Sequence, residues 1–163
     1  MTNASLIAAQ DQLPDVNIHI KTDGQIDTVS LKEWAAGRKI VLFAVPGAFT
    51  PTCSAKHLPE YVAECDAIKA KGVDAIACLS VNDAHVMDAW GQANNVNGIE
   101  MMADPLGEAS QALGIFVVNA PALGNTRAAR MALIADEGVV THVFMEEPGV
   151  YEVSSPAHVM ENL

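Results

Sequence analysis

The residues KIVLFAVPGAFTPTC, at positions 39–53, join an apolar run to a loop of proline, glycine and threonine. A run that is apolar without alternation is typical of a central strand covered on both faces. The loop ends at Cys53, where a helical stretch is expected to begin. This order places Cys53 beyond the carboxyl end of a predicted central strand, which is where α/β sheets form their sites.

The elements expected around this segment alternate between strands and helices. A β-hairpin is expected around Asp23-Gly24, and the capping-box residues at 30–33 open a short helix that Gly37 ends. After the loop we expect a helix over 52–70 interrupted by Pro59, a strand over 73–81, a helix capped by Asn82, a strand over 99–103, a helix over 106–113, a hairpin with its turn at 136–138, and a helix from Ser155-Pro156. The prediction is one α/β domain over residues 1–163 with a central mixed sheet.

Composition limits the class of partner. The 163 residues carry a formal net charge of -11, which argues against nucleic acid and anionic membranes as partners. No apolar run reaches membrane-spanning length, and no Lys or Arg precedes Lys21, so no charged targeting peptide is expected. Three cysteines do not make a disulfide scaffold, and we expect a cytoplasmic protein with packed, metal-bound or reactive thiols.

Cys53 is the candidate reactive group of the loop. With Thr50 as N-cap and Pro51 in the first helical position, Cys53 falls near unpaired N–H groups and the positive end of the helix dipole. These features favour the thiolate. Two other interpretations are a small buried hydrophobe and a metal ligand paired with His57, four residues further on. A structural zinc site needs further close ligands that the sequence lacks, so no metal is expected.

The stretch FAVPGAFTPTCSAKHLP, together with VDAIACLSVNDAHVMDAW and MMADPLG, closely resembles the peroxiredoxins. The resemblance is to the peroxiredoxin-5 subfamily, also called type II or atypical two-cysteine peroxiredoxins, and covers residues 13–143. Its signature, Pro-x-x-x-Thr-x-x-Cys, is met by Pro46, Thr50 and Cys53. The resemblance implies a thioredoxin-like fold, a homodimer, and reduction of hydrogen peroxide and organic hydroperoxides without a cofactor.

The resemblance also implies a role for each residue of the site. Cys53 matches the peroxidatic cysteine, whose thiolate attacks the peroxide and becomes a sulfenic acid. Thr50 matches the threonine that bonds thiolate and peroxide, Pro46 the proline that shields the pocket, and Arg130 the arginine of the site. Because O–O cleavage leaves negative charge on the departing oxygen, donors such as Arg130, the Thr50 hydroxyl and the Cys53 N–H would stabilise it. Arg127 better fits a surface cation at a strand end.

The sulfenic acid must condense with a thiol before it can be reduced. Cys65 would lie roughly 18 Å along the helix from Cys53, too far for a disulfide, and is expected to be packed or at the surface. Cys78 matches the resolving cysteine of plant type II enzymes, and its alternative is a core residue of a buried strand. The resolving cysteine of animal enzymes has no match near the C-terminus. An external thiol is therefore expected, with glutathione and glutaredoxin favoured over thioredoxin.

Two residues depart from the pattern of the resemblance. Glu60 replaces a usual glycine, and His85 replaces a usual phenylalanine that packs near the active site and the dimer contact. His85 is either a group that titrates there near neutral pH or a solvated helix residue. Two other functions are alternatives: a redox sensor that binds differently when Cys53 is oxidised, and a thiol–disulfide oxidoreductase, which the absence of C-x-x-C disfavours.

Overall fold

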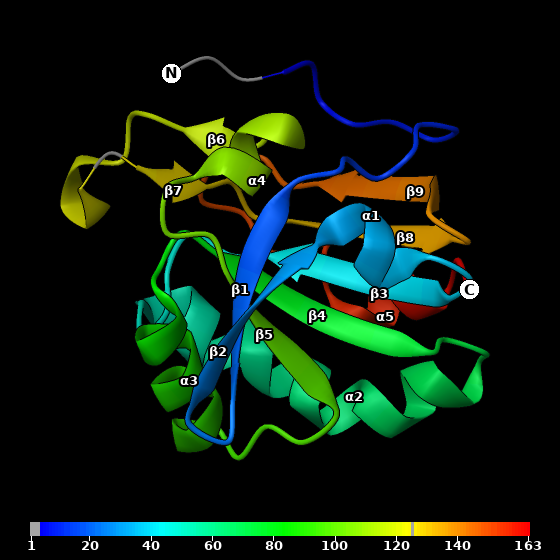
Figure 1. The fold of residues 1–163 in the computed structure, drawn as a ribbon, viewed down its shortest axis with the longest axis horizontal. Coiled ribbons are helices and arrows are strands. Elements are labelled where there is room, and N and C mark those ends of the chain that lie inside the picture. Colours follow the sequence, from blue (N-terminus) through cyan, green and yellow to red (C-terminus); the bar gives the residue numbers. More distant parts are fainter. Residues whose placement is uncertain (1–3, 125) are drawn as a thin grey trace.

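A seven-stranded mixed sheet forms the centre of the computed structural model, which describes residues 4–124 and 126–163 (Figure 1). From edge to edge the strands are β2 (Gln25–Ser30), β1 (Asn17–Thr22), β5 (Ile99–Ala103), β4 (Ala75–Ser80), β3 (Lys39–Ala44), β8 (Met131–Asp136) and β9 (Val139–Met145). The pairs β3–β4 and β4–β5 are parallel and the other pairs are antiparallel. The predicted α/β fold with a thioredoxin-like mixed sheet is confirmed.

The apolar run at 40–45 forms the central strand, as predicted. Its residues are fully buried, and they alternate between two hydrophobic clusters. Ile40 and Leu42 pack with residues of α1 (Leu31–Ala35) and α4 (Glu108–Ala112). Val41 and Phe43 pack with residues of α2 (Leu58–Ala70), α3 (Ala84–Ala93) and α5 (Pro156–Met160). Both faces of the sheet are therefore covered, and Figure 1 shows α2 and α3 on the side away from α1.

Both predicted hairpins form around two-residue turns. Asp23 and Gly24 have φ angles of 51° and 82°, and Glu137 and Gly138 have 51° and 81°. Left-handed φ at both central positions is the mark of the type I′ turn, whose twist matches that of antiparallel strands. The second turn is one residue shorter than predicted, because Asp136 still pairs with Val139 across β8 and β9.

The helix caps are partly as predicted. Ser30 and Ser155 cap α1 and α5, since their hydroxyls accept the N–H groups of Glu33 and His158. The predicted cap at Asn82 is wrong, because Asp83 caps α3. The Asn82 amide oxygen instead accepts hydrogen bonds from the N–H of Ala48 and the hydroxyl of Ser80.

The region between β5 and β8 differs most from expectation. The helix expected over 106–113 is shorter, since Gly107 is left-handed with a φ of 71° and α4 begins after it. A second sheet of two short strands, β6 (Phe116–Val117) and β7 (Arg127–Ala128), brackets the 3₁₀ turn η2 (Pro121–Leu123). Strands of two residues have no periodicity that a sequence pattern could reveal.

A π-helical turn, η1 (Cys53–His57), lies between the loop and α2. The N–H of Leu58 bonds to the carbonyl of Cys53, five residues earlier. Pro59 has no N–H, and its ring would clash with the carbonyl four residues before it, so a wider turn lets the backbone continue. The prediction that Pro59 interrupts the helix is therefore wrong. The irregular π-helical turn precedes Pro59 and begins at Cys53.

The helices described for residues 4–124 and 126–163 are all too short or too polar to cross a bilayer.

Candidate active site

The loop from Pro46 to Thr52 is held against the neighbouring strand and its following turn. Val45 donates its N–H to the carbonyl of Leu79 at 3.0 Å, and Ala48 donates to the Asn82 side chain at 3.0 Å. A Cβ at Gly47 would lie 3.0 Å from Nη1 of Arg127, so any other residue here would require that side chain to shift. The loop therefore presents Cys53 from a fixed frame.

Arg127 is part of that frame, and its assignment as a surface cation is wrong. The side chain is half-buried; Nε donates to the carbonyl of Leu123 at 2.8 Å and Nη1 donates to that of Val81 at 3.2 Å. Its guanidinium thus ties η2 to the end of β4. The sequence pattern gives no sign of these two contacts, because both acceptors are backbone carbonyls, which every residue type has.

Arg130 lies directly beside the sulfur of Cys53. Its Nη2 donates to Sγ at 3.1 Å, although the two residues are 77 positions apart. They meet because Arg130 precedes β8, which pairs with β3, and β3 leads into the loop that carries Cys53. The Cys53 side chain is buried, with 1% exposure. Arg130 thus places a fixed positive charge directly beside the sulfur, where it can stabilise negative charge.

His57 holds the other arm of the same guanidinium. Nη1 of Arg130 lies 2.7 Å from Nδ1 of His57, and Nε2 of His57 lies 3.1 Å from the carbonyl of Ser154. Because arginine can only donate, Nδ1 must accept and the ring proton must lie on Nε2, where it is donated to Ser154. Complete burial, followed by the nearby charge of Arg130, lowers the pKa of His57 from 6.5 to about 3. A neutral acceptor thus orients Arg130 without cancelling its charge.

The sequence pattern suggests His57 only as a metal ligand and gives no sign of its contact with Arg130. The one available signal was its spacing of four residues from Cys53, which places both on one face of the turn. Among the described residues there is no group of three or more His, Cys, Asp or Glu side chains placed to hold a metal ion.

The segment 146–155 closes the site from the other side. The buried Glu146 carboxylate accepts the N–H groups of Glu152, Val153 and Ser154 and the Ser154 hydroxyl at 2.6–3.2 Å. Burial acts to raise the pKa of Glu146, but these hydrogen bonds outweigh it and hold the pKa below the usual value. The Ser154 carbonyl, fixed in this way, also accepts the hydroxyl of buried Tyr61 at 2.7 Å. His57 therefore rests on a rigid backbone acceptor.

A cavity of about 590 Å³ opens beside Arg130. Its walls are largely apolar and include Val117, Leu123, Met145 and Val150. Pro46, Thr52, Arg127 and Arg130 line the same cavity and join it to the loop that carries Cys53. A small molecule with a polar head and an apolar tail would fit this distribution of groups.

Thr50 and Pro46 reach the site, but Thr50 behaves differently from expectation. Its carbonyl accepts the N–H of Ser54, yet its hydroxyl donates to the Gly47 carbonyl at 2.6 Å instead of capping an N–H group. Among the described hydrogen bonds there is none between this hydroxyl and the Cys53 sulfur. With its proton directed to Gly47, the Thr50 oxygen is left able to accept a hydrogen bond from a bound ligand.

The other two cysteines are buried and in their free thiol form. Cys65 lies in α2, and its sulfur contacts the carbonyls of Gly98 and Asn97 at 3.6 and 3.8 Å, so it is a packed thiol as expected. Cys78 lies in β4 on the face that also carries Cys53, and desolvation raises its pKa well above the usual value.

The two departures from the family pattern have different surroundings. His85 is exposed on α3, and its Nδ1 lies 3.3 Å from Nζ of Lys21. His85 is therefore a solvated helix residue, which is the second of the two interpretations that the sequence allows for it. Glu60, on α2, instead accepts a hydrogen bond from the hydroxyl of Tyr151.

The buried His57 should make stability depend on pH in a specific window. Its pKa is lower in the folded state, so only the unfolded chain gains this proton as pH falls below about 6.5. The free energy of unfolding should fall by up to about 1.4 kcal/mol per pH unit from this group between pH 6.5 and 5, before the carboxylates titrate.

His57→Asn supplies the control, because asparagine keeps an acceptor near Nδ1 and does not titrate. Urea unfolding at pH 5 and 6.5 should show a smaller loss of stability in His57→Asn than in the wild type. Equal losses in both proteins would contradict the assignment of a neutral, buried His57.

The chain is similar to known proteins over most of its length. The redoxin family model matches residues 8–158. Peroxiredoxin-2E-2, chloroplastic, from Oryza sativa subsp. japonica is 44% identical over 168 residues, covering 99% of this chain and 75% of the relative. Peroxiredoxin-2B from Arabidopsis thaliana is 41% identical over 160 residues, covering 96% of this chain and 98% of the relative.

Among solved structures, reduced Prx3 from Vibrio vulnificus in complex with hydrogen peroxide superposes with a TM-score of 0.93. It is 44% identical, and the match covers 96% of this chain and 99% of that one. Together with the family model and the two plant relatives, this likeness extends over nearly the whole chain. The chain therefore belongs to the redoxin family and, within it, to the peroxiredoxins, the thiol-dependent peroxidases.

Proposed function

We propose that Cys53 is the peroxidatic cysteine, and that the chain reduces hydrogen peroxide and small organic hydroperoxides through it. The observation that carries the proposal is the 3.1 Å hydrogen bond from Arg130 to Cys53 Sγ. Cys53 bonds Arg130 and follows Thr52, and both of these residues line a cavity that a small molecule can enter.

In the proposed reaction, the Cys53 thiolate attacks the terminal oxygen of the peroxide. The S–O bond forms as the O–O bond breaks, so the sulfur is oxidised to sulfenic acid and the peroxide is reduced. The departing oxygen leaves as hydroxide or alkoxide and takes up a proton to give water or an alcohol. Arg130 would stabilise that developing charge, and the Thr50 oxygen would accept a hydrogen bond from the O–H group of the bound peroxide.

The cavity supports the inclusion of organic hydroperoxides among the substrates. Its apolar walls next to Arg130 would receive an alkyl tail while the peroxide group lies at the sulfur. The net charge of -11 would disfavour strongly anionic hydroperoxides, apart from any local attraction by Arg127 and Arg130.

Rapid mixing with one equivalent of hydrogen peroxide tests the assignment. Fast oxidation, a mass gain of one oxygen that peptide mapping places on Cys53, and turnover with a thiol donor are expected. Slow oxidation of Cys53 without turnover under any thiol donor would favour the redox-sensor alternative.

We further propose that an external thiol recycles the sulfenic acid, either glutathione with glutaredoxin or thioredoxin. The burial of Cys78 within β4 supports this, because a disulfide with Cys53 would require the loop and η1 to unfold locally. The sulfur of Cys65, on α2, contacts the backbone carbonyls of Asn97 and Gly98 instead of Cys53.

Intact-mass measurement of Cys78→Ser separates the two recycling routes. After one equivalent of peroxide and no added thiol, we expect both Cys78→Ser and the wild type to hold a sulfenic acid. A disulfide that forms in the wild type and is lost in the variant would show that Cys78 resolves. Cys65→Ser serves as the matched control, since it removes a buried thiol from α2.

A homodimer and a cytoplasmic location are also proposals. The dimer rests on the family resemblance, and sedimentation of the purified chain would test it. The location rests on the expectation that a chain with three cysteines and no disulfide scaffold keeps its thiols reduced.

A further inference from the structure

The ring of Tyr151 lies against Arg130, the donor to the Cys53 sulfur, and against His57, the acceptor for the same guanidinium. Its centroid is 4.8 Å from that of the His57 ring, and the guanidinium carbon of Arg130 is 5.8 Å from the Tyr151 centroid. An aromatic face at this distance attracts a cation and limits the directions that its side chain can take. Tyr151 therefore covers Arg130, which bonds Cys53, and His57, which bonds Arg130.

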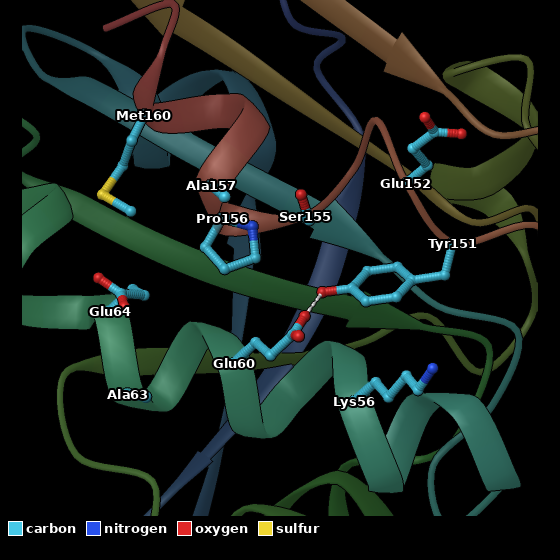
Figure 2. A pocket seen from close by; sticks show the side chains of 10 residues that line it. All are labelled: Lys56, Glu60, Ala63, Glu64, Tyr151, Glu152, Ser155, Pro156, Ala157 and Met160. Carbon is cyan, nitrogen blue, oxygen red and sulfur yellow. Dashed lines mark hydrogen bonds between the residues drawn. The ribbon is translucent and has the colours of Figure 1, made fainter.

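The position of the Tyr151 ring depends on a contact from another element. The hydroxyl of Tyr151 donates to the carboxylate of Glu60 on α2 (Figure 2). Tyr151 follows the exposed residues 147–150, and the backbone bonds to Glu146 begin only after it, at Glu152. The bond to Glu60 is thus well placed to fix the ring over the site.

We propose that Glu60 is a positioning residue for peroxide reduction. By holding the Tyr151 hydroxyl, it keeps the ring against His57 and Arg130, and so keeps the guanidinium directed at Cys53 Sγ. The proposal rests on the proposed roles of Cys53 and Arg130. It also gives a role to the residue that stands where the family resemblance has glycine.

A purely electrostatic role for Glu60 predicts the opposite sign. A carboxylate near the site disfavours a second negative charge, so its removal would favour the Cys53 thiolate and speed the reaction. If Glu60 instead acts through Tyr151, its removal loosens Arg130, disfavours the thiolate and slows the reaction. The sign of the effect therefore separates the two roles.

The groove between α2 and the segment 151–160 offers a matched control. Glu64 lines the same groove as Glu60, one helical turn further along, as Figure 2 shows. Within the described residues no hydrogen bond joins Glu64 to Tyr151. Removing Glu64 deletes the same charge from the same groove while leaving the contact intact.

The test compares Glu60→Ala, Glu60→Gln, Tyr151→Phe, the double variant Glu60→Ala/Tyr151→Phe, and Glu64→Ala. Two quantities are measured: the rate of Cys53 oxidation by hydrogen peroxide in rapid mixing, and the midpoint pH of Cys53 alkylation by iodoacetamide. Glu60→Ala and Tyr151→Phe should each slow oxidation about threefold to tenfold, as expected for one lost hydrogen bond, and should raise the midpoint.

The double variant should be no slower than either single variant, because both substitutions remove the same bond. Glu60→Gln should recover most of the rate, since its amide oxygen can accept the tyrosine hydroxyl. Glu64→Ala should react like the wild type.

An unchanged or faster rate in Glu60→Ala would overturn the proposal, as would equal slowing in Glu64→Ala. Additive losses in the double variant would also overturn it, because they would mean that the two residues act separately. Failure of the proposed function looks different: Cys53→Ser or Arg130→Met would then keep wild-type peroxide reduction, whatever Glu60 does.

Discussion

Cys53→Ser is expected to reduce peroxide consumption to the uncatalysed background. A serine hydroxyl does not ionise near neutral pH, and oxygen lacks the nucleophilicity and the accessible sulfenic state of sulfur. The substitution is otherwise small, because the hydroxyl can accept the hydrogen bond that Arg130 now gives to Sγ. Loss of activity should therefore occur without loss of the fold.

The measurement is peroxide consumption with a thiol donor, compared with Cys65→Ser and Cys78→Ser. Both control variants remove a buried thiol of the same size and should retain the first oxidation step. Thermal unfolding of all three variants shows whether they are folded. Residual wild-type activity in folded Cys53→Ser would refute the assignment of the nucleophile.

Arg130→Met should slow oxidation by about 10²- to 10³-fold, the effect of removing one fixed donor from a developing anion. Methionine retains the apolar length of the side chain but neither of the contacts, to Cys53 Sγ at 3.1 Å and to His57 Nδ1 at 2.7 Å. The charge that favours the thiolate is also lost, so the midpoint pH of Cys53 alkylation should rise.

Arg130→Lys distinguishes charge from geometry. Lysine keeps the cation, but a single ammonium does not reproduce a rigid fork that holds the sulfur and the imidazole at once. We expect an intermediate rate in rapid mixing with hydrogen peroxide. A rate in Arg130→Met within twofold of the wild type would contradict the role of the guanidinium, since about 1.4 kcal/mol of lost stabilisation already gives tenfold.

The contact network also explains why a histidine adjoins a site that needs a positive charge. A carboxylate at position 57 would hold Arg130 but would partly neutralise it, whereas the imidazole accepts a hydrogen bond while remaining uncharged. With a pKa of about 3, the His57 ring stays neutral at and well below neutral pH. The burial that lowers this pKa comes from the rings of Phe43, Tyr61 and Tyr151, which pack on His57.

Much of the fold followed from local patterns. The apolar run at 40–45, the two turns with glycine, and the serine caps at Ser30 and Ser155 are each determined by residues close in sequence. The family resemblance added Arg130, whose contact with Cys53 spans 77 positions. No local pattern carries that information.

Other features depended on competition between equally suitable residues. Asn82 and Asp83 are both suitable N-cap residues for α3. Asp83 takes the position because the Asn82 side chain accepts hydrogen bonds from Ala48 and Ser80 instead. Arg127 and Arg130 are both cations near the start of a strand, Arg127 in β7 and Arg130 just before β8. Only the packed chain shows that one binds backbone carbonyls and the other binds the sulfur.

Local sequence patterns predict a strand, a tight loop and a helix start that bring Cys53 to the carboxyl ends of the parallel strands. These features are predictable because hydrophobic periodicity, proline and caps act over a few residues. The contacts of the sulfur depend instead on how distant parts of the chain pack together. Arg130, His57, Tyr151 and Glu60 converge through strand pairing and through the packing of the segment 146–155, interactions between parts of the chain that no local pattern connects.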